Sequence, residues 1–162
     1  MKTLYLVRHG KSSWEYDLPD HKRPLEKRAY NDAELVLSAL QKHLTHEVKM
    51  YSSKAVRALE TAKMFKKELQ VKDSDFTVLE DLYAFNVQHL MQVIQGFDDR
   101  ENNIMIFGHN PAFTSVANYL GDDFIDNVPT TGLVCISFQQ KSWKEISDGK
   151  TLFKLFPKMF RS

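Results

Sequence analysis

The chain has 162 residues, of which 43% are hydrophobic and 27% are charged, and these are ordinary values for a folded globular protein. Its 22 basic and 21 acidic residues give a formal net charge of +1 with no long block of either sign, which argues against a nucleic-acid-binding protein. Cys135 is the only cysteine, so an internal disulfide and a thiolate metal cluster are excluded. No apolar run reaches the length of a signal peptide or a membrane span. We therefore expect one domain over residues 1–162, located in the cytoplasm and without a membrane partner.

Two hydrophobic periodicities divide the chain into strands and helices. Apolar runs rich in β-branched and aromatic residues predict strands, whereas apolar residues three or four positions apart predict helices. In chain order, the expected elements are a strand at 3–7, a surface loop at 11–24, a helix at 27–44, a strand at 48–51, a helix with an apolar face at 55–69, a strand at 76–79, a helix at 86–97, a strand at 104–107, a helix at 111–120, and strands at 133–138 and 151–156. This alternation predicts an α/β fold: a three-layer α/β/α sandwich with a mostly parallel central sheet, whose last strands pair antiparallel at an edge.

Two of the helices begin directly after a strand and carry residues typical of helix starts. Ser52 and Ser53 follow the second strand as candidate N-caps. Asn110 follows the fourth strand as a candidate N-cap, with Pro111 at the first helical position. These junctions place two helix N-termini at the carboxyl edge of the sheet, where ligands of such folds bind.

Four side chains suited to phosphate chemistry lie at the carboxyl ends of the first, second and fourth strands. Arg8 and His9 end the first strand, Arg57 lies in the first turn after the second strand, and His109 follows the fourth strand. Guanidinium groups match phosphate oxygens in geometry, and unpaired helix N–H groups supply further donors. The sequence therefore predicts a site for a phosphoryl group that requires no metal and no other cofactor.

A histidine in such a cationic cluster is suited to nucleophilic attack. Nearby positive charge lowers the pKa of an imidazole, which keeps its lone pair available near neutral pH. The same positive charges stabilise the equatorial oxygens in the transition state of phosphoryl transfer. For Arg57 alone a solvated helix start, and for His109 alone a turn into a helix, would be sufficient explanations, so the prediction rests on their shared position.

With these residues, the chain resembles the histidine phosphatase superfamily, which has a phosphoglycerate mutase-like fold. In detail it is similar to the compact SixA-type phosphohistidine phosphatases. The resemblance implies that His9 is the phosphoacceptor, that Arg8 and Arg57 hold the phosphoryl oxygens, and that His109 contributes to the same pocket. It also implies a phosphate contact for Ser12. The matching segments are Arg8 to Trp14, Arg23 to Leu25, Ser53, Arg57-Ala58, Thr61-Ala62, Gly108 to Pro111 and Pro129-Thr130.

The chain departs from this family in two places. Glu15 stands where the mutase branch has Asn, and we expect its charge to point away from the pocket. Some branches have a general acid, a Glu shortly before a Gly. The nearest counterpart here is Glu80, with Asp81 as the alternative, and Ala84 stands where the pattern has Gly. A phosphoramidate needs less proton donation than an ester does, so a weak acid favours phosphohistidine as substrate.

These observations favour a phosphatase that acts through a phosphohistidine intermediate on His9, with phosphohistidine on a protein as substrate. Two alternatives stay open: a phosphatase or mutase for small phosphomonoesters, and a non-catalytic phosphate-binding module. The expected partner is thus a phosphorylated protein or a small phosphorylated metabolite. His21, His43, His46 and His89 lack the spacing of a metal site and are interpreted as surface residues.

Overall fold

The computed structural model describes residues 1–162 and contains one six-stranded sheet with the strand order β3-β2-β4-β1-β5-β6. Strands β3, β2, β4 and β1 pair with one another in parallel, whereas β5 is antiparallel to β1 and to β6. The expected mostly parallel sheet with antiparallel pairing at one edge is confirmed. The strands are β1 (Lys2–Arg8), β2 (Lys49–Ser52), β3 (Phe76–Val78), β4 (Asn103–Gly108), β5 (Leu133–Phe138) and β6 (Lys150–Leu155).

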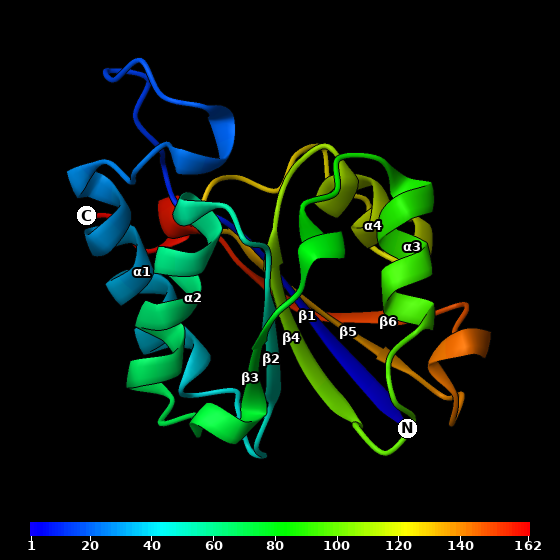
Figure 1. Ribbon diagram of the computed structural model, residues 1–162. Helices are drawn as coiled ribbons and strands as arrows, with labels where there is room; N and C mark the ends of the chain where they lie inside the picture. Colours follow the sequence, from blue (N-terminus) through cyan, green and yellow to red (C-terminus); the bar gives the residue numbers. More distant parts are fainter.

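Helices cover both faces of the sheet, so the expected three-layer α/β/α sandwich is also confirmed. Helices α1 and α2 lie on one face, and α3 and α4 lie on the other (Figure 1). The α-helices are α1 (Lys27–Leu40), α2 (Val56–Glu68), α3 (Val87–Gln95) and α4 (Ala112–Leu120). Short 3₁₀ helices are η1 (Asp20–Lys22), η2 (Asp73–Asp75), η3 (Glu80–Leu82), η4 (Trp143–Glu145) and η5 (Pro157–Met159). None of the helices combines the length and apolar character needed to cross a membrane.

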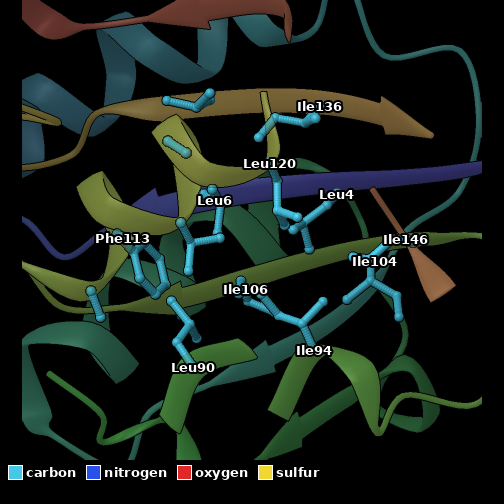
Figure 2. Close-up of a cluster of buried hydrophobic side chains, with 14 of the residues drawn as sticks. Leu4, Leu6, Leu90, Ile94, Ile104, Ile106, Phe113, Leu120, Ile136 and Ile146 are labelled. Atoms are coloured by element: carbon cyan, nitrogen blue, oxygen red, sulfur yellow. The ribbon is translucent and has the colours of Figure 1, made fainter. Parts of the chain in front are cut away.

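Alternate residues of the central strands supply two hydrophobic cores. In β1, Leu4 and Leu6 belong to a cluster of 20 buried residues beneath α3 and α4, and Tyr5 and Val7 belong to one of 15 beneath α1 and α2. Figure 2 shows side chains of β1, β4, α3 and α4 converging in the first cluster. Each buried leucine stabilises the fold by about 1.5–3 kcal/mol. Because both faces of the sheet carry apolar side chains, helices pack against it on both sides.

Several helix boundaries differ from the sequence prediction, including the end of α3, which lies at Gln95 rather than at residue 97. Helix α1 ends at Leu40 rather than at residue 44, because Lys42 and His43 donate to carbonyls three residues back and tighten the chain into a turn. Helix α2 begins at Val56, so neither Ser52, which ends β2, nor Ser53 is its N-cap. Helix α4 begins at Ala112, one residue later than predicted, with Pro111 at its N-cap.

The register of the sheet brings the ends of three parallel strands to one edge. Arg8 of β1 lies opposite Gly108 of β4, and Ser52 of β2 lies opposite Phe107. The carboxyl ends of these strands lie at the top of the sheet in Figure 1. The segments that follow them are therefore neighbours in space although they are far apart in sequence.

Candidate active site

A cavity of about 300 Å³ lies at this carboxyl edge. Four predicted residues, Arg8, His9, Arg57 and His109, line it together, as does Ser12. Glu15 is exposed and is not among the lining residues, as expected. The complete lining is Arg8, His9, Lys11, Ser12, Trp14, Asp20, Arg23, Arg57, Phe85, His109, Asn110 and Thr130.

Gly10 allows the segment after β1 to turn tightly beneath α1. A Cβ atom at this position would lie 2.8 Å from the Cβ atom of Ala29 in α1, closer than real Cβ atoms approach. The N–H of Gly10 donates to Oγ1 of Thr61 in α2 at 2.9 Å, and the N–H of His9 donates to the carbonyl of Gly108 at 3.0 Å. The turn is thus held by α1, α2 and β4 at once, and this fixes the backbone that carries His9.

One ring nitrogen of His9 is committed to the backbone, and the other is free. Nδ1 lies 2.6 Å from the carbonyl oxygen of Gly10, and because a carbonyl can only accept, Nδ1 carries the proton. Burial is the largest cause that lowers the pKa of His9 to about 3, and the charges of Arg57, Arg8 and Arg23 add to it against the opposing Gly10 bond. His9 is therefore neutral at pH 7, with a lone pair on Nε2.

His109 lies beside His9, with the ring centroids 5.4 Å apart. It is 1% exposed, and its Nε2 lies 2.8 Å from Oγ of Ser53. Burial is the largest cause that lowers the pKa of His109 to about 3, followed by the charge of Arg57. The site thus holds two neutral imidazoles among cationic side chains.

Three buried nitrogen atoms of the lining residues have no hydrogen-bond partner within the protein: the guanidinium Nε of Arg8, the guanidinium Nε of Arg57 and the imidazole Nδ1 of His109. Leaving a buried donor unsatisfied costs about 1–3 kcal/mol, and more for a charged group. Such donors are rare in folded proteins, and they cluster here around His9. The arrangement is typical of a site that binds a tetrahedral oxyanion through several N–H donors.

Arg23 supplies a third guanidinium group at the cavity, and its place there was not predicted from the sequence. It is 6% exposed, and its Nη1 donates to Oγ of Ser12 at 2.8 Å. Its Cζ lies 3.5 Å from the ring centroid of Trp14, a cation–π contact. Ser12, predicted to contact phosphate, thus lines the cavity and also holds Arg23.

Asp20 is an acidic residue at the cavity that was not predicted from the sequence. Arg57 donates to its backbone oxygen from Nη1 and to its carboxylate from Nη2, and Tyr83 donates its hydroxyl to the same carboxylate. Burial raises the pKa of Asp20, but the hydrogen bonds from Tyr83 and Arg57 outweigh it and lower the pKa to about 2. Only its spacing of three residues from Arg23 in a polar loop could have indicated an ion pair, which the structure has at 3.3 Å.

The structure does not bring Glu80 or Asp81 into the cavity. The Glu80 side chain is 75% exposed and forms an ion pair with Lys54, and the Asp81 side chain is 81% exposed and lies 3.7 Å from His89. Both belong to η3, which buries Leu82 completely and thereby turns the two carboxylates outward. Neither residue suggested by the family pattern as general acid therefore lines the cavity.

Fold and cavity together define an α/β sandwich with a cationic, two-histidine site at the carboxyl edge of its sheet. Residues 4–92 match the family model of the histidine phosphatase superfamily (branch 1), and the chain belongs to this superfamily. It is also 27% identical over 153 residues to an uncharacterized chloroplastic protein of Arabidopsis thaliana, an alignment that spans 89% of this chain and 70% of that protein.

Solved structures with the same fold include SixA proteins. The protein histidine phosphatase SixA in complex with tungstate superposes with a TM-score of 0.81 at 16% identity, over 98% of this chain and 99% of that one. The putative phosphohistidine phosphatase SixA of Agrobacterium tumefaciens gives 0.77 at 20% identity, over 95% and 97% of the two chains. A putative α-ribazole-5′-P phosphatase of Escherichia coli gives 0.65 at 15% identity, over 96% of both. The compact SixA-like fold expected from the sequence is confirmed.

Proposed function

We propose that this protein is a phosphatase that transfers a phosphoryl group to His9 and then to water, and that its substrate is phosphohistidine on a protein. The observation that carries the proposal is the geometry at His9. Its Nδ1 is committed to Gly10, which leaves Nε2 as a nucleophile within a buried cluster of N–H donors. The SixA structure with tungstate supports the proposal, because tungstate is a tetrahedral oxyanion like phosphate.

In the first step, the lone pair of His9 Nε2 attacks phosphorus in line with the leaving group. The Nε2–P bond forms while the bond from phosphorus to the substrate nitrogen breaks, and its electron pair goes to the leaving imidazole. Arg8, Arg57 and His109 line the cavity with the unpartnered N–H groups that meet the equatorial oxygens. Such preorganised donors provide most of the rate gain in phosphoryl transfer.

In the second step, water attacks the phosphorus of phospho-His9. The proton on Nδ1, held by the Gly10 carbonyl, makes the phosphorylated ring cationic, so its Nε2–P bond breaks to return a neutral imidazole without a proton donor. Asp20 is the only acidic residue that lines the cavity. Its ionised carboxylate accepts a hydrogen bond from the attacking water and orients it.

The lack of a protonated carboxyl group in the cavity supports a phosphoramidate substrate over an ester. An alkoxide leaving group needs a strong general acid, but Asp20 is ionised at neutral pH and Glu80 lies outside the cavity. The imidazole of phosphohistidine leaves as a neutral ring when its other nitrogen is protonated, and it needs no such acid. The free, buried thiol of Cys135 supports a reducing cytoplasmic setting, which we also propose.

The test compares wild type with His9→Ala on a phosphohistidine protein and on a panel of small phosphomonoesters. We expect turnover of phosphohistidine by the wild type, an acid-labile phosphoryl adduct during turnover, and loss of both in His9→Ala. His89→Ala is the matched control, because His89 lies outside the cavity and its imidazole lies 3.7 Å from the exposed carboxylate of Asp81. Equal turnover by His9→Ala would refute the nucleophile assignment. Preferential ester turnover would identify a small-molecule phosphatase, and tungstate binding without any turnover would identify a binding module.

A further inference from the structure

We propose that Ser53 is a positioning residue that fixes the tautomer of His109, so that His109 presents an Nδ1–H group to the phosphoryl oxygens. The inference rests on the proposed function for its chemical purpose. Its structural basis is the 2.8 Å contact between Oγ of Ser53 and Nε2 of His109. Ser53 follows β2 and His109 follows β4, and the N–H of Ser53 donates to the carbonyl of Phe107 at 3.0 Å, which ties the two segments together.

The tautomer follows from counting the protons at Ser53. Its Oγ accepts the backbone N–H of Ala55 at 3.2 Å, and its only other contact is Nε2 of His109. Ser53 is 0% exposed, so water does not reach the hydroxyl. A serine hydroxyl has one proton to donate, and His109 Nε2 is the only acceptor available to it. Nε2 therefore accepts, and the neutral ring carries its proton on Nδ1.

Because Nε2 is turned toward Ser53, Nδ1 is the ring nitrogen that remains available to the cavity. His109 is one of the lining residues, and its Nδ1 is buried without a partner in the protein. The ring is packed by Tyr83, with centroids 5.3 Å apart and planes at 87°, and by Phe85, with centroids 4.9 Å apart. These aromatic contacts restrict the ring, while the Ser53 hydroxyl decides which nitrogen holds the proton.

The opposite tautomer would place a lone pair on the cavity nitrogen. A lone pair facing a phosphoryl oxygen repels it, whereas an N–H group stabilises the charge that develops there. Because the pKa of His109 is lowered to about 3, the ring does not gain a second proton near neutral pH that would supply the donor in either case. Control of the tautomer is therefore needed for His109 to act as a donor.

Three variants separate this role from a packing role. Ser53→Ala removes the hydroxyl that selects the tautomer, and Ser53→Thr retains a hydroxyl. Ser52→Ala is the matched control, since Ser52 is a neighbouring buried serine whose Oγ donates to the carbonyl of Ser53 and does not contact His109. For Ser53→Ala we expect kcat to fall by about tenfold or more with little change in KM, because the missing donor acts in the transition state. Ser53→Thr and Ser52→Ala should retain most of the wild-type kcat.

The direct measurement is the ring ¹⁵N shifts of His109 at pH 7, assigned with a His109→Gln variant. We expect a protonated Nδ1 and an unprotonated Nε2 in the wild type and in Ser52→Ala, and a mixture of tautomers in Ser53→Ala. A wild-type His109 protonated on Nε2 would overturn the inference even if Ser53→Ala does not fold, and so would an unchanged tautomer in a folded Ser53→Ala. The ¹⁵N shifts report the tautomer of His109 whether or not the protein turns over a substrate. A correct tautomer in a protein without phosphatase activity would therefore refute the proposed function and leave the role of Ser53 intact.

Discussion

Arg57 holds Asp20 through two hydrogen bonds, from Nη1 to the backbone oxygen at 2.7 Å and from Nη2 to the carboxylate at 2.9 Å. The Arg57 side chain is 3% exposed, whereas that of Asp20 is 43% exposed. The ion pair therefore links a buried cation to a carboxylate that is half exposed to solvent. The contact orients the guanidinium and leaves its Nε without a protein partner. Its cost is a negative charge at a site that we propose binds a phosphoryl group.

Replacing Asp20 should therefore separate binding from turnover. Asp20→Asn keeps the backbone acceptor and removes the negative charge, so we expect tungstate to bind more tightly by about fivefold, or about 1 kcal/mol for a half-exposed charge. Turnover of phosphohistidine should fall, because an amide oxygen is a weaker hydrogen-bond acceptor for the attacking water than an ionised carboxylate is. Isothermal titration and steady-state kinetics check both effects, with Asp17→Asn, an exposed loop residue outside the cavity, as the control. Weaker tungstate binding in Asp20→Asn would contradict the expected repulsion.

The two histidines should make the protein less stable in acid. Their pKa values are about 3 in the folded state against 6.5 for an ordinary histidine, so between these pH values the unfolded chain binds protons that the folded chain does not. The free energy of unfolding is thus highest above pH 6.5 and decreases as the pH falls, by at most about 1.4 kcal/mol per pH unit for each histidine. Urea unfolding at pH 7 and pH 5 measures the slope, and His109→Gln should reduce it. An identical slope in that variant would argue against a neutral, buried His109.

Gly10 should tolerate no side chain while Ala29 faces it. Gly10→Ala places a Cβ atom 2.8 Å from the Ala29 Cβ atom, and we expect a loss of about 1–3 kcal/mol in the free energy of unfolding together with reduced turnover, because the His9 backbone must shift. Ala29→Gly in the same chain should restore turnover. Gly96→Ala is the control, since its Cβ would meet nothing closer than 3.4 Å. Full activity of Gly10→Ala alone would show that the turn can relax without displacing His9.

The variant Glu80→Gln tests whether Glu80 donates a proton to the leaving group. Because Glu80 lies outside the cavity and pairs with Lys54, we expect phosphohistidine turnover to stay within about twofold of wild type, the range of ordinary surface substitutions. The decisive readout is kcat over a range of pH for phosphohistidine and for a phosphomonoester in parallel. A selective loss of ester hydrolysis would mean that η3 rearranges to bring this carboxylate to the substrate.

Much of the fold could be predicted because periodicity reports burial directly. The apolar run at 133–138 matches β5 residue for residue, since every side chain of that strand is buried. The helix starts were harder, because Ser53 and Asn110 have side chains that serve equally well as caps or as partners elsewhere. In the structure, Oδ1 of Asn110 does accept an N–H of the first turn of α4, that of Thr114 at 3.0 Å, whereas Ser53 bonds to His109. Local propensity cannot distinguish these uses.

The sequence by itself determined the α/β class and the approximate position of each strand. It also placed Arg8, His9, Arg57 and His109 at one edge, because each follows or ends a parallel strand whose carboxyl end lies there. Only the tertiary structure decided how they are held. Asp20 reaches Arg57 across 37 positions and Ser53 reaches His109 across 56, distances over which no local pattern operates. It also turned Glu80 outward by burying Leu82 beside it. Chain order can place a residue at an edge, but its proton and its partner depend on long-range packing.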